Sequence, residues 1–181
     1  SVTTTTTAVT TSTTTTINYC SSQADQVVGI RFRNIQIPKS VDGVPVVITS
    51  ARIIFTAYAD SGDNSTDPAT LYIAGQAADN PGEFVAGTSS SPTIGNISGR
   101  AETTAKVTWA DVGQWTTGSQ ANATTPDLKD IVQEIIDRTN WQAGNAMVFK
   151  ITGEPGSRRR AHSYNSSASK SPVLVIEYEP C

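Results

Sequence analysis

The two cysteines have the most distinctive placement of any reactive residues in this chain. Cys20 and Cys181 bracket the part whose composition is typical of a folded domain. A disulfide between them would tie the first strand to the last and close a loop of about 160 residues, contributing about 4–5 kcal/mol in the chain-entropy model. Two unrelated free thiols are the alternative. We expect the disulfide, and with it an oxidising compartment.

An acidic loop offers oxygen ligands for a hard cation. Asp60, Asp63 and Asp67 lie close together in the sequence, with Asn64 among them. Calcium binds carboxylate and amide oxygens in flexible loops, although this spacing does not match an EF-hand. The alternative is a solvated turn, because these are ordinary turn residues. Calcium is the only cofactor for which the sequence offers a candidate site.

Covalent glycans have two sets of candidate attachment sites. Four Asn-x-Ser/Thr sequons stand beside turn-like residues, from which a glycan would project. These sequons are at Asn64, Asn96, Asn122 and Asn165. The O-glycan candidates are threonines of the N-terminal tail, namely Thr4, Thr6, Thr10 and Thr14. The sequence therefore predicts a glycosylated, secreted protein.

The three tryptophans are candidates for a sugar-stacking platform. Trp109 lies in phase with the apolar residues of an alternating strand, and Trp141 follows a helix, so both are expected in the core. Trp115 stands in the loop 113–118 and is the one candidate for an exposed platform. Burial in the core is the alternative for Trp115 as well.

Catalytic chemistry has little support in this sequence. His162 is the single histidine, and no nucleophile, metalloprotease, phosphate-loop or dinucleotide motif is present. The net charge is −3, and the densest basic cluster is Arg158–Arg160, which argues against nucleic-acid binding. No apolar run reaches the roughly 18 residues that a membrane span needs. We therefore expect neither an enzyme nor a membrane-spanning protein.

The N-terminal tail is the main low-complexity segment. Residues 1–16 read SVTTTTTAVTTSTTTT, and the first 24 residues contain no charge and no proline. β-Branched threonine favours extended backbone. Mucin-like stalks usually contain proline. A strand of 16 residues would span about 53 Å, against about 17–20 Å for an ordinary strand.

Three interpretations of the tail therefore compete. It is a glycosylated stalk, an edge strand of its own domain, or a donor strand that adds to the sheet of a neighbouring copy. In the third case Val2, Ala8, Val9 and Ile17 are candidate anchors. A head-to-tail contact of this kind does not close on itself and builds a filament. The excess length favours the donor strand, with this chain itself as the partner.

Alternating apolar residues predict several short strands. Val28, Ile30 and Phe32 begin the series, and Asp42-Gly43 marks a turn. A long strand follows over 46–58, with Val47, Ala51, Ile53, Phe55 and Ala57 on one face. Further strands are expected over 71–74, 105–109, 147–151, 159–164 and 173–178, while 79–100 should be irregular.

One segment predicts a helix, over about 126–138. Leu128, Ile131, Val132, Ile135 and Ile136 follow the spacing of one buried helical face. Thr125 is the expected N-cap, and Pro126 the expected first helical residue. Asp127 near the start and Arg138 near the end suit the helix dipole.

The expected fold is all-β, a jelly-roll β-sandwich with this one short amphipathic helix and an extended tail strand. Residues 1–16 form the tail and residues 17–181 the domain.

An ordered set of sequence blocks resembles the DNRLRE or disaggregatase-type jelly-roll modules, which are related to carbohydrate-binding modules. The blocks are 28–38, 48–55, 126–136, Trp141, 144–149, 163–165 and 172–178. The resemblance covers roughly residues 26–179 and implies a jelly-roll domain of a secreted or surface protein, with the ligand open. The tail and the terminal cysteines are not part of that pattern.

The function predicted from these features is structural. We expect a subunit of an extracellular, glycosylated filament that polymerises head-to-tail through its N-terminal strand. The alternative is a secreted carbohydrate-binding module with a Thr-rich linker. A fragment of a secreted glycan-active enzyme is a third, weaker possibility.

Overall fold

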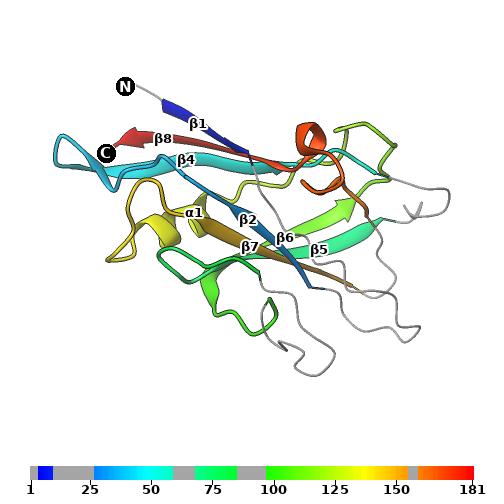
Figure 1. The fold of residues 1–181 in the computed structure, drawn as a ribbon, viewed down its shortest axis with the longest axis horizontal. Coiled ribbons are helices and arrows are strands. Elements are labelled where there is room, and N and C mark those ends of the chain that lie inside the picture. The colour runs from blue at the N-terminus through cyan, green and yellow to red at the C-terminus, as the bar shows by residue number, and fades with distance from the viewer. Residues whose placement is uncertain (1–3, 10–26, 59–67, 85–96, 155–158) are drawn as a thin grey trace.

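Two four-stranded antiparallel sheets face each other across an apolar core (Figure 1). This computed structural model describes residues 4–9, 27–58, 68–84, 97–154 and 159–181, with residues 4–9 described as backbone only. The first sheet has the order β1-β8-β4-β3, from β1 (Thr4–Val9), β8 (Val173–Pro180), β4 (Val44–Ile54) and β3 (Ser40–Val41). The second has the order β2-β7-β5-β6, from β2 (Val28–Phe32), β7 (Met147–Gly153), β5 (Ala69–Gln76) and β6 (Glu102–Val112). The predicted all-β class is confirmed.

Strands β2 and β8 follow the alternation of the sequence except at Val28, which is exposed at the start of β2. Ile30 and Phe32 of β2 are buried, and so are Leu174, Ile176 and Tyr178 of β8. Successive side chains of a strand point to opposite faces, so each strand presents one apolar face to the core. The turn at Asp42-Gly43 joins β3 to β4 with both residues at positive φ, as a two-residue hairpin requires.

Strand β4 departs from the predicted phase. The pairing of β4 with β8 shifts register between Ile48 and Ser50. Ala51 and Ile53 point into the core as predicted, but on the other side of this bulge Val46 and Ile48 are the buried residues. Val47 is 40 % exposed, so its predicted place on the core face is wrong. A bulge inserts one unpaired residue and so reverses the alternation.

The predicted strand over 159–164 is absent. Within the described part of this segment, only Ala161 makes a β-bridge, to Ala57. The backbone then turns, because Ser166 and Ser167 both donate their N–H groups to the carbonyl of Ser163. A 3₁₀ turn over Ala168–Lys170 leads into β8.

Helix α1 spans Lys129–Ile136, shorter than predicted. Its N-cap residue is Leu128, and no side chain caps it. The expected cap is wrong because the Thr125 hydroxyl accepts a hydrogen bond from the N–H of Ile53 on β4 instead. The predicted apolar face is confirmed, since Ile131, Val132, Ile135 and Ile136 are buried along with Leu128.

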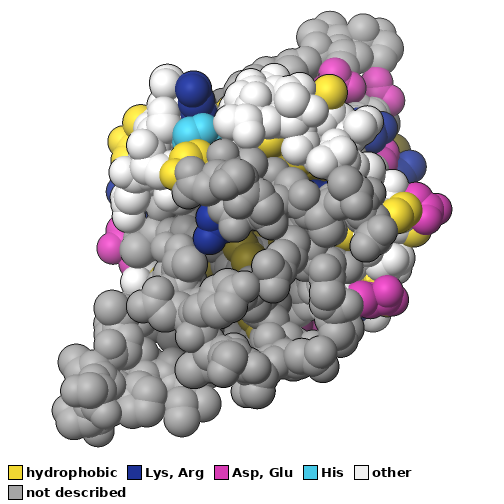
Figure 2. Space-filling view, turned by 90° about the vertical axis from the view of Figure 1, so that its right-hand side faces the viewer, with side chains coloured by type: hydrophobic (Ala, Val, Ile, Leu, Met, Phe, Trp, Pro, Cys, Tyr) yellow, Lys and Arg dark blue, Asp and Glu magenta, His cyan; other side chains and the backbone are white. Residues whose placement is uncertain are grey.

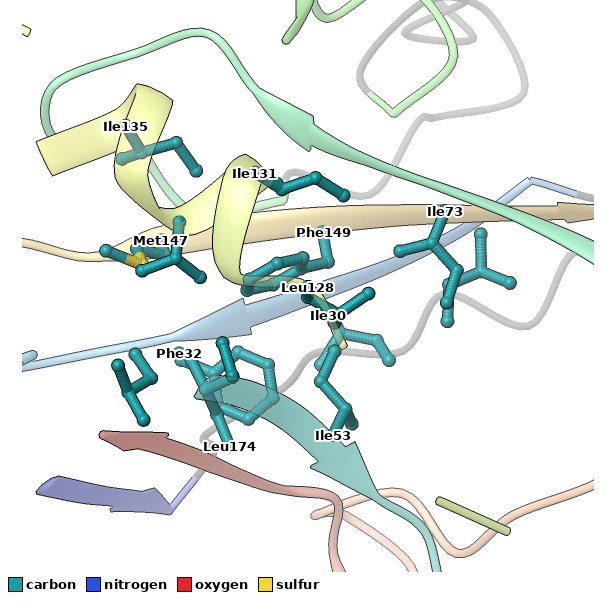
Figure 3. Close-up of a cluster of buried hydrophobic side chains, with 14 of the residues drawn as sticks. Ile30, Phe32, Ile53, Ile73, Leu128, Ile131, Ile135, Met147, Phe149 and Leu174 are labelled. Atoms are coloured by element: carbon teal, nitrogen blue, oxygen red, sulfur yellow. The ribbon is translucent and has the colours of Figure 1, made fainter. Parts of the chain in front are cut away.

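The main core fills the space between the sheets and beneath α1 (Figure 3). Phe32 and Phe149 meet edge to face at 5.9 Å between ring centroids. The helix comes close to β5 at Gly75, where an added Cβ would lie 2.7 Å from Ile131 Cγ2 and 2.9 Å from Ile135 Cδ1. Because Gly75 has no side chain, α1 can pack this close to β5.

A smaller core covers the outer face of the second sheet. Phe84, Ile97 and Val148 form it, over Gly29 of β2. Beside it, Lys150 is only 4 % exposed and donates to the carbonyls of Ser98 and Arg100. Its ammonium group also pairs with Glu102 at 2.8 Å. These contacts fix the start of β6 to the sheet.

Candidate functional site

Strand β1 occupies one edge of β8, and β4 occupies the other. The pairing with β1 is antiparallel over six positions, from Thr4 opposite Tyr178 to Val9 opposite Val173. β8 therefore has one strand position to fill beyond β4, and residues 4–9 fill it. Among the described residues, β1 has β8 as its one strand neighbour.

This docking position lies at the rim of the main core. Thr4, Thr6 and Ala8 stand opposite the buried Tyr178, Ile176 and Leu174. Thr5, Thr7 and Val9 stand opposite Glu177, Val175 and Val173, which are half-buried. A strand in this position therefore borders the apolar residues of β8.

Only some of the tail residues singled out in the sequence lie within the described part of the chain. Thr4, Thr6, Ala8 and Val9 belong to β1. Val2, Thr10, Thr14 and Ile17 lie outside the described residues. Residues 4–9 pair with their own domain, so for this segment the edge-strand arrangement is the one found in a single chain.

Beyond the short strand β3, the outer edge of β4 is covered by side chains and by the backbone of residues 123–128. Gln133 of α1 accepts a hydrogen bond from the N–H of Ile48 through Oε1 and donates to the carbonyl of Val46 through Nε2. Asp127 Oδ1 accepts from the N–H of Ala51 at 2.9 Å. Together with the Thr125 contact to Ile53, these bonds satisfy much of the outer edge of β4.

Helix α1 also closes the edge of β6. Glu134 accepts from the N–H of Thr104 through Oε1 and from the N–H of Ala105 through Oε2, each at 2.8 Å. One helix thus caps an edge of each sheet. These bonds occupy two N–H groups near the start of β6, and backbone groups paired in this way are not offered to another strand.

The two predicted disulfide partners are not both described. Cys181 is an exposed free thiol, and its N–H donates to the carbonyl of Pro45. Cys20 lies outside the described residues. The pairing is not formed in the structure and stays a prediction.

Two of the four sequons are described, and both lie in exposed turns. Asn122 has a positive φ of 59°, and its carbonyl accepts from the indole N–H of Trp115. Asn165 stands in the turn held by Ser163 and Ser166. Asn64 and Asn96 lie outside the described residues, as do the calcium candidates Asp60, Asp63 and Asp67.

Trp115 is not an exposed platform. It is 5 % exposed, its ring stacks on Phe55 at 5.8 Å, and it also contacts Trp109. The loop that carries it folds back because its indole N–H reaches the carbonyl of Asn122 at 2.8 Å. Trp109 and Trp141 are buried, as predicted.

The exposed aromatic residue in the middle of a sheet is Tyr72, which sequence reasoning missed. It stands on β5, is 43 % exposed and pairs with Thr108 and Thr152 of the flanking strands. Its hydroxyl donates to Glu154 at 2.8 Å, and this hydrogen bond raises the pKa of Tyr72. Period-2 alternation with the buried Ile73 is the signal that could have found it.

One end of the sandwich carries the histidine, visible in Figure 2 beside basic and apolar side chains. His162 meets Tyr58 edge to face at 4.9 Å, and its Nδ1 lies 3.3 Å from the Ser166 hydroxyl. Partial burial, and then the charge of Lys170, lower the pKa of His162. These neighbours do not include an acid and a nucleophile in a catalytic arrangement.

Within the described ranges, no three His, Cys, Asp or Glu side chains cluster in a way that would hold a metal ion. No helix in these ranges has the length and apolar character needed to cross a bilayer.

Comparisons with known proteins do not assign the chain to a family. No family model matches it, and no curated protein matches it significantly.

Proposed function

We propose that this protein is a structural subunit of an extracellular, glycosylated filament, in which the N-terminal strand of each copy docks on β8 of the next. The observation that carries the proposal is the position of β1 at the one edge of β8 that β4 leaves open. Strand addition of this kind obtains its affinity from main-chain hydrogen bonds.

Exchange between copies would preserve every pairing of the single chain. All copies have the same residues 4–9, so a neighbour's strand can adopt the register that ends with Thr4 opposite Tyr178 and Val9 opposite Val173. Exchange of an identical element is a low-cost route to assembly, and a head-to-tail exchange whose rotation does not close continues as a filament.

The length of the chain between β1 and β2 permits the exchange. Residues 10–27 separate the two strands. A segment of that length reaches about 60 Å when fully extended, which is enough to pass into an adjacent domain. The absence of charge in residues 1–24 removes electrostatic repulsion between tails of neighbouring copies.

A jelly-roll topology is part of the proposal. Its support is the repeated crossing of the chain between the sheets, since β1, β3, β4 and β8 belong to one sheet and β2, β5, β6 and β7 to the other. Residues 123–125 also run beside the end of β4. The N–H of Phe55 donates to the carbonyl of Ala123, and the N–H of Thr125 donates to the carbonyl of Ile53. Double-sheet jelly rolls have eight strands in such an order.

Cysteine cross-linking between two differently substituted chains tests the exchange. In a background with Cys20→Ser and Cys181→Ser, one chain carries Thr5→Cys and the other Glu177→Cys. These positions are directly opposite in the β1–β8 pair. We expect a mixed disulfide between the two chains after assembly and mild oxidation, identified by its mass, together with fibres in negative-stain electron micrographs.

The matched control replaces Glu177→Cys with Val173→Cys, which is four positions out of register with Thr5. It should give little mixed product. If the in-register pair forms no more mixed disulfide than this control, and concentrated protein contains no fibres, the filament proposal is wrong.

Carbohydrate binding is the second candidate function. Tyr72 replaces Trp115 as the candidate residue on which a sugar ring would stack. Its support is an exposed ring whose hydroxyl is held by Glu154 at the centre of a sheet. Affinity electrophoresis in gels containing cellulose derivatives, xylan or polygalacturonate tests it. Retardation that Tyr72→Ala abolishes and Tyr164→Ala leaves intact would favour this function, and no retardation in any gel would exclude it for these polymers.

A further inference from the structure

We propose that the pairing of β1 with β8 in the same chain is an autoinhibitory contact, which must open before a subunit can accept the strand of another copy. This inference rests on the proposed function and concerns its regulation. It starts from the occupancy of β8, which has β4 on one edge and its own β1 on the other.

Occupation of that edge is exclusive. The register with β1 uses each residue of β8 from Val173 to Tyr178, and the register with β4 uses the opposite edge of the same segment, shifted at a bulge. A second strand cannot pair with those backbone groups while β1 is present. A neighbour's strand therefore binds after the chain's own strand has left.

The chain's own β1 and the β1 of a neighbouring copy have the same sequence, so their contacts with β8 do not decide which of them binds. The relative concentration of the two strands decides it. A strand tethered by residues 10–27 faces its own β8 at an effective concentration in the millimolar range, far above the micromolar level of free chains in dilute solution. Dilute subunits therefore stay closed, and assembly waits for the release of β1.

The release needs only β1 to move. On the opposite side of the sandwich, side chains such as Gln133 and Glu134 hold the strand edges from a helix that is itself packed into the core. β1 has β8 as its only strand neighbour among the described residues. β1 can therefore leave β8 without changing the side of the core that α1 covers.

Binding of a fluorescent peptide with the sequence of residues 1–9 to the full-length chain tests the proposal. For the wild-type chain, we expect an association rate that stops rising as peptide concentration increases, because release of β1 becomes limiting. For a chain with Thr5→Pro and Thr6→Pro, the rate should rise linearly and exceed the wild-type plateau at least about tenfold. One of two consecutive N–H groups faces the partner strand, so this pair of prolines weakens the chain's own β1 whatever its phase.

The matched control carries Thr5→Ala and Thr6→Ala, which retain both N–H groups and should keep the plateau. Equal, linear rates for all three chains would overturn the autoinhibition and leave strand docking in place. If the peptide binds none of the three, although circular dichroism shows each to be folded, the docking proposal itself fails.

Discussion

The two long sides of the sandwich are completed in different ways. On one side, α1 packs on the core and its side chains cap the edges of β4 and β6, through Gln133 and Glu134. On the other side, β1 completes the first sheet through strand pairing with β8. The first side is fixed by packing and by polar side chains, and the second by a segment at the end of the chain.

In the proposed strand exchange, this difference would separate stability from assembly. The α1 side buries large apolar residues and pairs several backbone groups of β4 and β6 with side chains, so those groups are not offered to another chain. The β1 side is completed by six residues that any copy of the protein can supply. A protein that polymerises by strand exchange needs one closed side to stay folded and one exchangeable side to connect.

The largest effect should come from removing a core residue on the α1 side. Ile131 is fully buried at the contact between α1 and β5. Ile131→Ala should lower the free energy of unfolding by about 2–5 kcal/mol, because it leaves a cavity. Urea denaturation followed by tryptophan fluorescence measures this. Val47→Ala, at an exposed position of β4, is the control and should change stability by less than about 0.5 kcal/mol.

Overpacking the same contact should have the next largest effect. Gly75→Ala places a Cβ 2.7 Å from Ile131 Cγ2, so the helix must shift. We expect a loss of about 1–3 kcal/mol. Gly82→Ala, where the added Cβ meets no atom within 4 Å, should leave the melting temperature nearly unchanged. Equal melting temperatures for the two variants would show that α1 is not seated against Gly75.

An ion pair at the start of β6 should make stability depend on acid pH. Hydrogen bonds from Lys106 and then Lys150 lower the pKa of Glu102 in the folded chain. The contribution of Glu102 is therefore complete above the unfolded-state pKa of about 4.5 and is lost as the pH falls through the lower folded value.

Glu102→Gln tests this dependence. It should cost about 1–2 kcal/mol at pH 7, less than for a fully buried pair because Glu102 is partly exposed. The variant should also lose less stability than the wild type between pH 5 and pH 3, a range set by the ordinary Glu pKa. Thermal melts across that range measure both effects, and parallel curves for the two chains would contradict the assignment.

The smallest effect should come from the caps themselves. Glu134→Ala leaves the N–H groups of Thr104 and Ala105 to water and should lower stability by about 1 kcal/mol. Hydrogen exchange should quicken at these two amides. Lys129→Ala, on the same helix but outside the buried face, is the control. Unchanged exchange in Glu134→Ala would mean that the helix does not close the edge of β6.

Much of the fold could be predicted because local patterns and final burial agree. The alternation through Ile30 and Phe32, and the helical spacing through Ile131 and Ile135, both place the right side chains in the core. The pattern failed at Val47, where a bulge reverses the alternation. A bulge depends on the pairing of β4 with a strand more than a hundred residues later, and no local signal marks it.

The candidate sites were harder to predict than the elements. Trp115 lies in a loop whose composition suggests exposure, but its indole reaches across to Asn122 and its ring stacks on Phe55. Thr125 has the right type and position for a helix cap, yet β4 uses its hydroxyl. In both cases a distant segment decides the outcome, Phe55 for the ring of Trp115 and β4 for the hydroxyl of Thr125.

The amino-acid sequence by itself determined most of the strands, the one helix, and that the N-terminal tail is uncharged and suited to extended backbone. These properties depend on side-chain type and spacing within a few residues. Only the tertiary structure decided that residues 4–9 lie on β8, that α1 closes the opposite side, and that Tyr72 rather than Trp115 is exposed. Strand order and edge capping are contacts between residues far apart in the chain, so they exist only once both sheets have formed.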